Sequence, residues 1–98
     1  MGQHRAKQFF TCFITMVART ITENDILPVL RKIDSCYVER KITSDEADDL
    51  TNCVTWVIGK TAGETNVQHV VSQLRGYKEF IPKEIVSSVI NEVRKALG

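Results

Sequence analysis

The chain has 98 residues, of which 43% are hydrophobic and 26% are charged, and this composition is ordinary for a folded globular protein. The composition argues against an intrinsically disordered chain, and the length favours one domain over residues 1–98. Thirteen basic side chains nearly balance twelve acidic ones, so no strong overall field draws the protein towards nucleic acid or a membrane.

The charges are less evenly distributed along the chain than this balance suggests. Residues 1–20 hold three basic residues (Arg5, Lys7 and Arg19) and no acidic residue. Residues 43–63 hold four acidic residues and one basic residue, Lys60. The simplest interpretation is two solvated faces, but the layout matters if copies of the chain associate.

Three cysteines, Cys12, Cys36 and Cys53, stand at wide spacings that match no metal-binding or redox motif. Each lies within an apolar pattern, where a free cysteine behaves as a small hydrophobic residue. We therefore expect reduced thiols and a cytoplasmic location rather than a disulfide framework. Neither His4 nor His69 lies near a pair of cysteines, so the sequence predicts no zinc site and no other cofactor.

The first segment, residues 1–20, starts with basic residues and continues with an apolar run from Phe9 to Ala18. This order is also the outline of a secretory signal peptide. Met16 is too large for the small-residue position before a cleavage site, and two threonines interrupt the run. The run is too short to span a bilayer, so we expect a helix of the folded protein and no membrane segment.

That predicted helix is apolar over most of its circumference. A helix of this kind has to be covered on two sides, and in a small chain a second copy is the natural source of the cover. The sequence therefore predicts a homo-oligomer, in its simplest form a dimer, or a complex with another protein. The candidate interface residues are Phe9, Phe10, Phe13, Met16 and Val17.

The next helix is predicted within Ile21–Lys41. Thr22 and Asp25 have the spacing of a capping box, but a helix that begins at Thr22 places Pro28 in the second turn, where its missing N–H is unfavourable. We expect the helix to begin near Asp25, with Pro28 in its first turn. The residues predicted to be buried are Leu27, Leu30, Ile33, Tyr37 and Val38.

The clearest helix start in the chain lies in the stretch Ile42–Gly63. Thr43 can cap the first turn, and Glu46, three residues later, completes a capping box. The acidic residues that follow complement the positive end of the helix dipole. Gly63 is the predicted end of the helix. Its apolar stripe consists of Leu50, Val54, Val57 and Ile58, widened by Cys53 and Trp56.

A fourth helix is predicted after Gly63. Thr65 and Gln68 have the spacing of another capping box, and Gly76 suits the left-handed position that ends a helix. The residues from Tyr77 to Phe80 are read as a linker. The apolar stripe of this helix is Val67, Val70, Val71 and Leu74.

The last predicted helix has Pro82 in its first turn, the position that proline prefers. Phe80 and Ile85 have the spacing of a hydrophobic staple around this start. The core-facing stripe is Val86, Val89, Ile90, Val93 and Leu97.

The stretch from Trp56 to Leu74 has the proportions of a helix-turn-helix pair, which gives an alternative function in nucleic-acid binding. The second helix of that pair offers little positive charge to phosphates. A basic patch would form only if the fold gathers residues from several elements. The candidate nucleic-acid contacts are Arg31, Lys32, Arg75 and Lys78.

The sequence gives only weak support for a catalytic, calcium-binding or phosphate-binding site. The acidic cluster from Asp45 to Asp49 is better explained as solvated charge at a helix start than as a catalytic carboxylate pair. A calcium loop over Ser35–Glu46 lacks the acidic ligands and has Arg40 where the required glycine should stand. Gly59-Lys60-Thr61 resembles the end of a phosphate-binding loop but lacks the upstream glycine and strand.

The sequence thus predicts an all-α protein, an irregular bundle of about five short helices. Its predicted function is that of a non-enzymatic interaction or regulatory module, which associates with itself or with another protein through the apolar N-terminal helix.

Overall fold

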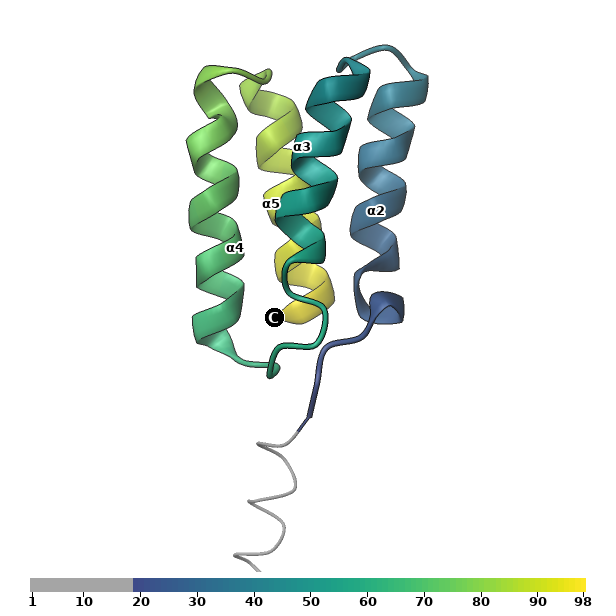
Figure 1. The fold of residues 1–98 in the computed structure, drawn as a ribbon. Helices are drawn as coiled ribbons and strands as arrows, with labels where there is room; N and C mark the ends of the chain where they lie inside the picture. The colour runs from purple at the N-terminus through teal and green to yellow at the C-terminus, as the bar shows by residue number, and fades with distance from the viewer. Residues whose placement is uncertain (1–18) are drawn as a thin grey trace, which may run out of the picture.

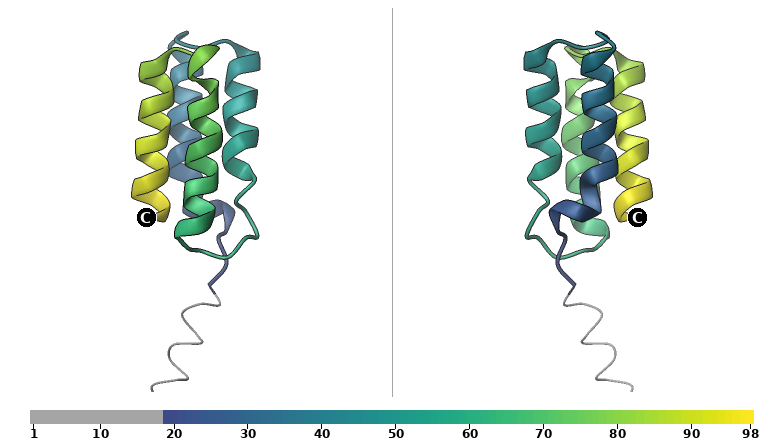
Figure 2. Two further views of the ribbon diagram at one scale, coloured as in Figure 1. Left: turned by 90° about the vertical axis from the view of Figure 1, so that its left-hand side faces the viewer. Right: turned by 90° about the vertical axis from the view of Figure 1, so that its right-hand side faces the viewer.

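The computed structural model describes residues 19–98, and these residues form a four-helix bundle (Figure 1). Its helices are α2 (Glu23–Val38), α3 (Ser44–Thr55), α4 (Glu64–Gly76) and α5 (Lys83–Leu97), with a short 3₁₀ helix η1 (Tyr77–Glu79) between the last two. Each helix runs antiparallel to the one before it (Figures 1 and 2). Helix α5 packs back against α2, which closes the four helices into a ring.

The all-α class predicted from the sequence is confirmed, but the number and regularity of the helices need correction. The described part of the chain holds four α-helices in a regular up-down-up-down order rather than an irregular set of about five. The first predicted helix covers residues 1–20, of which all but Arg19 and Thr20 lie outside the described residues, and these two are not helical.

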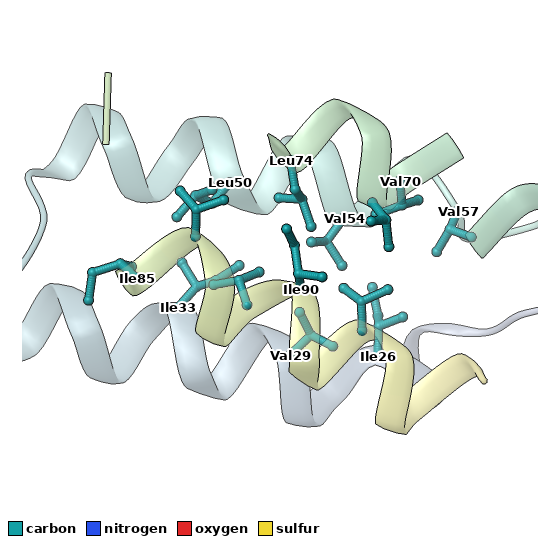
Figure 3. Packing of buried hydrophobic residues seen from close by; sticks show 14 of the residues in the cluster. Ile26, Val29, Ile33, Leu50, Val54, Val57, Val70, Leu74, Ile85 and Ile90 are labelled. Atoms are coloured by element: carbon teal, nitrogen blue, oxygen red, sulfur yellow. The ribbon is translucent and has the colours of Figure 1, made fainter. Parts of the chain in front are cut away.

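The core of the bundle is almost purely aliphatic. Within residues 19–98, nineteen hydrophobic side chains are buried, and all of them are valine, isoleucine or leucine except Cys36. No polar or charged side chain of the described residues is buried with them. Side chains from all four helices point into the same space, among them Ile33, Leu50, Leu74 and Ile90 (Figure 3). Burial of this apolar surface is the main favourable term in the folding of the bundle.

Helix α3 begins as its sequence predicts. The hydroxyl of Thr43 accepts a hydrogen bond from the backbone N–H of Glu46 at 3.2 Å, and the Glu46 carboxylate accepts one from the N–H of Thr43 at 2.9 Å. The helix ends earlier than predicted, at Thr55 rather than near Gly63. Of its predicted stripe, Leu50, Val54 and Val57 are buried, whereas Ile58 is 37% exposed.

Helix α2 begins earlier than predicted. Its N-cap is Thr22, so Pro28 lies inside the helix. The first turn of α2 is set at an angle to the rest of the helix (Figure 2). The Asp25 carboxylate accepts hydrogen bonds from the N–H of Thr22 at 2.8 Å and from its hydroxyl at 3.2 Å. These local bonds, with the burial of Ile21 and Ile26 on either side, outweigh the single helical hydrogen bond that proline cannot make.

The buried side of α2 also differs from the prediction. Tyr37 and Val38, both expected in the core, are 45% and 67% exposed. Because apolar residues surround much of this helix, its sequence alone does not distinguish two overlapping stripes. Contacts with α3 and α5 select the one formed by Ile26, Val29, Ile33 and Cys36.

A Schellman motif closes α2 and leads into α3. The N–H of Lys41 donates to the carbonyl of Cys36, and the N–H of Arg40 donates to that of Tyr37, both at 2.9 Å. Arg40 occupies the left-handed position of the motif with a φ of 63°, where glycine is the usual residue. The motif reverses the chain within five residues and sets α3 antiparallel to α2.

The starts of α4 and α5 differ in detail from the predicted ones. Gly63 is the N-cap of α4, so Thr65 lies inside the first turn and forms no capping box. Gly76 has a φ of −64° and continues into η1 instead of ending the helix in a left-handed conformation.

At α5, Pro82 is the N-cap rather than a first-turn residue. Phe80 is 76% exposed and therefore does not staple the helix start. The staple positions around this cap belong to Ile81 and Val86, both buried.

The predicted stripes of α4 and α5 are otherwise confirmed, since every member is buried except Leu97, which is partly buried. Among the described helices, none has both the length and the apolar character that crossing a membrane requires.

Candidate interaction surfaces

The point at which residues 1–18 join the bundle is held by backbone hydrogen bonds. Thr20 and Thr61 form an isolated antiparallel bridge. The N–H of Ile21 donates to the carbonyl of Lys60, and the N–H of Gly59 donates to the carbonyl of Ile21, both at 2.9 Å. The first described residues are therefore held beside the turn that follows α3 (Figure 1).

The residues predicted to form the self-association surface belong to that preceding segment. Phe9, Phe10, Phe13, Met16 and Val17 all lie outside the described residues. The core of the described residues is built from side chains between Ile21 and Val93.

An aromatic cluster lies close to the same end of the bundle. The indole of Trp56, in the turn after α3, stacks on the imidazole of His69 in α4, with ring centroids 4.1 Å apart. The Lys60 ammonium lies 4.4 Å from the centroid of the indole and donates a hydrogen bond to the Trp56 carbonyl at 3.3 Å. Trp56 nevertheless keeps 38% of its surface exposed.

An open cavity of about 350 Å³ lies beside this cluster, between α3 and α4. Its wall includes Cys53, whose thiol lies 4.0 Å from the carbonyl of Val70. Burial raises the pKa of the Cys53 thiol to about 11, so the thiol stays protonated and is a poor nucleophile near neutral pH. The cavity therefore does not have the properties of a nucleophilic site.

The aromatic residues of the described chain are all excluded from the core. Tyr37, Trp56 and Phe80 are 45%, 38% and 76% exposed, and Tyr77 packs at the edge of the core without being buried. Aromatic side chains bury a large area each and usually dominate cores and interfaces. The aliphatic composition of this core was not foreseen from the sequence, because position along a helix does not specify which residue types meet in the interior.

The predicted nucleic-acid contacts fall on two separate parts of the bundle. Arg31 and Lys32 lie on α2, whereas Arg75 and Lys78 lie at the end of α4 and on η1. Helices α2 and α4 occupy opposite corners of the ring (Figure 1). Moreover, α3 and α4 run antiparallel, whereas the two helices of a helix-turn-helix meet at about 90–120°.

A different basic surface lies in the groove between α2 and α5, and of its residues the sequence had indicated only Lys32 as a candidate nucleic-acid contact. Two neighbouring hollows of about 450 and 390 Å³ share Lys32 and Ser88 as lining residues and follow one another along the two helices. We call them together the α2–α5 groove. Its charged lining consists of Lys32, Lys41, Arg94 and Lys95 against Glu84 and Glu92. Only the ring closure of α5 on α2 brings these residues together, which is why no local pattern indicates them.

The outer face of α3 carries the opposite charge. Asp45, Asp48 and Asp49 are exposed at positions i, i+3 and i+4, so they lie on one side of the helix. No basic side chain within residues 19–98 forms an ion pair with any of the three. We call this surface the acidic face of α3.

In the part of the chain that the structure describes, no group of three histidine, cysteine or acidic side chains is placed to hold a metal ion. Comparison with known proteins gives no further guide to the site, since no protein-family model, curated protein or solved structure matches the chain.

Proposed function

We propose that this protein is a non-enzymatic interaction module that associates with a second copy of itself through its apolar N-terminal segment. The proposed contact residues are Phe9, Phe10, Phe13, Met16 and Val17, which precede the four-helix bundle in the sequence. The free thiols of Cys36 and Cys53 fit a reducing compartment such as the cytoplasm.

The observation that carries this proposal is the division between an aliphatic interior and aromatic residues outside it. The chain has seven aromatic side chains: four are outside the core of the described bundle, and three are Phe9, Phe10 and Phe13. A bundle that folds around valine, isoleucine and leucine has no need of these residues for its own core. Large aromatic side chains outside a core are typical of contact surfaces, where they supply most of the binding energy.

The contacts of Thr20 and Ile21, which directly follow the segment, support the same proposal. The bridge between Thr20 and Thr61 holds these residues against the turn after α3, which also contains Trp56 and Ile58, 38% and 37% exposed. A second copy that brings its own segment to this turn would meet two apolar side chains that the core leaves partly exposed.

Sedimentation equilibrium of the full chain at micromolar concentration tests the proposal. In about 0.5 M salt, where charged contacts are screened, we expect a dimer or larger assembly for the natural sequence and a monomer for the double variant Phe9→Ser with Phe13→Ser, because each substitution removes a large apolar area from the contact. The matched control is Phe80→Ser, which removes the same side chain at the opposite end of the bundle and should leave the mass unchanged.

A natural sequence that remains a monomer in this assay would overturn the self-association. If that monomer instead captures a different protein in a manner lost in the Phe9→Ser and Phe13→Ser variant, the segment is a docking element for another partner.

A further inference from the structure

We propose that the α2–α5 groove is a docking site for the acidic face of α3 of a second copy of this chain. The contact is separate from the N-terminal segment and uses only residues that the structure describes. It joins two different surfaces, one on each copy, so it is a head-to-tail contact.

Charge complementarity is the first argument. The groove has four basic and two acidic side chains along its walls. Lys41 and Lys95 are partly neutralised by Glu39 at 3.1 Å and Glu92 at 3.8 Å. Lys32 and Arg94 form no ion pair within residues 19–98, so they remain available to an acidic partner.

The acidic face of α3 carries the negative charge that complements these basic side chains. Asp45 and Asp49 lie one turn apart on its exposed side, without a basic partner in the described bundle. A positive groove on one copy and a negative helix on the other attract each other and fix their relative orientation.

The dimensions are also compatible. Helix α3 has 12 residues and α5 has 15, which correspond to lengths of about 18 and 22 Å at the usual rise per residue. The groove extends from Arg94, near the end of α5, to Lys41, beyond the end of α2, so its length is comparable to that of α3. Its floor includes the nearly buried Cys36 and Ile85, which supply apolar contact beneath the charges.

The geometry leads to an open assembly. After one copy inserts its α3 into the groove of the next, that next copy still presents its own acidic face to a third. Such contacts produce a chain of molecules, or a ring if the rotation between copies closes. The association should weaken as salt screens the charges.

A charge-swap experiment tests the proposal in the full chain with Phe9→Ser and Phe13→Ser, so that apolar association does not mask the result. The groove variant carries Lys32→Glu and Arg94→Glu, and the face variant carries Asp45→Lys and Asp49→Lys. Sedimentation velocity at low ionic strength should show that each variant alone associates at least about tenfold more weakly than their common parent.

The mixture of the two variants gives the decisive result. The groove variant keeps its natural acidic face, which can bind the natural groove of the face variant. The face variant presents lysines in place of Asp45 and Asp49, and these can bind the glutamates that replace Lys32 and Arg94 in the groove variant. We therefore expect the equimolar mixture to recover the association that both variants lose. Two variants that remain monomeric when mixed would overturn the proposal, as would a parent that does not associate at low salt.

Two controls make the interpretation unambiguous. Arg75→Glu with Lys78→Glu makes the same change in net charge away from the groove and should leave association unchanged. If the face variant loses its helical circular dichroism, Asp45→Asn with Asp49→Asn replaces it and should show the same loss when alone.

A groove variant that keeps its self-association but loses a salt-dependent shift of duplex DNA would assign the groove to nucleic acid instead.

Discussion

The imidazole of His69 stacks on the indole of Trp56 at a centroid distance of 4.1 Å, with 25° between the ring planes. The two residues belong to α4 and to the turn after α3, so the stack joins neighbouring elements from outside the core. Trp56 therefore has polar neighbours and solvent around it, whereas the interior beneath consists of aliphatic side chains. Because the aromatic residues lie outside the aliphatic core, we make separate predictions for the stability of the bundle and for its contacts.

The interior should respond strongly to the loss of one side chain. Leu50 is fully buried among side chains of the other helices (Figure 3). Replacing it with alanine should lower the free energy of unfolding by about 2–5 kcal/mol, because the packed helices cannot fill the cavity completely. Urea denaturation followed by circular dichroism measures this loss.

The control for that substitution is Val38→Ala, at a helical residue that is 67% exposed. It should change the free energy of unfolding by no more than about 0.5 kcal/mol. Equal losses in the two variants would mean that Leu50 is not part of a packed core.

The turn between α2 and α3 should tolerate glycine better than the arginine it contains. Arg40 has a φ of 63°, a conformation that costs an ordinary residue about 1–2 kcal/mol, whereas glycine adopts it freely. The greater freedom of glycine in the unfolded chain offsets part of this gain, so Arg40→Gly should raise the free energy of unfolding by about 0.5–1 kcal/mol.

The opposite change at Gly59 provides the comparison. Gly59 has a φ of 86° and open space around its missing side chain, so only the backbone conformation opposes a larger residue. Gly59→Ala should lower the free energy of unfolding by about 1 kcal/mol. A stabilising effect there, or a destabilising one for Arg40→Gly, would contradict these backbone assignments.

Acid should weaken the start of α2. The N–H of Thr22 is the main cause that lowers the pKa of Asp25 below its ordinary value of 3.8, and the Arg19 guanidinium, 2.9 Å away, adds to the effect. Because the folded-state pKa is the lower one, the contribution of Asp25 to stability is complete above the ordinary value and is lost as pH falls through the folded value.

Chemical denaturation between about pH 2 and about pH 6 measures this dependence, which Asp25→Asn should reduce. Arg19→Gln removes the ion pair but keeps the bond from the Thr22 N–H, so it should preserve most of the dependence. If Arg19→Gln reduces the pH dependence of stability as much as Asp25→Asn does, the ion pair rather than the helix cap is the main cause of that dependence.

The thiols of the bundle should be slow to react while the protein is folded. A rise in the pKa of Cys53 from 9.0 to about 11 leaves roughly 100-fold less thiolate near neutral pH, and Cys36 is only 4% exposed. In the full chain with Cys12→Ser, iodoacetamide should label both cysteines rapidly only in denaturant. Rapid labelling of Cys53 in the native protein would mean that the space between α3 and α4 opens readily.

The features that sequence reasoning predicted correctly are those whose chemistry is local. Thr43 and Glu46 are three residues apart and complete their hydrogen bonds without help from other helices. The stripes of α4 and α5 were also predictable, because a single apolar band leaves one possible buried side. The wrong boundaries depend on distant contacts: α3 is followed by a turn in which Gly59 donates to the carbonyl of Ile21, thirty-eight residues earlier in the chain.

The contact surfaces were harder to predict for the same reason. Lys32 and Arg94 are far apart in the sequence and line one groove only because α5 closes the ring against α2. The sequence pattern also placed Tyr37 in the core, although its neighbours Ile33 and Cys36 take the buried positions. Which of two overlapping stripes faces inward is decided by the partner helices rather than by the helix itself.

The central claim is that a self-sufficient bundle carries a separate apolar segment through which copies associate. It is tested most directly by the dependence of the thermal midpoint on protein concentration, measured for the full chain and for residues 19–98. In about 0.5 M salt, where charged contacts are screened, the midpoint of the full chain should rise with concentration and that of residues 19–98 should stay constant. A constant midpoint for the full chain, or a parallel rise for both, would contradict the claim.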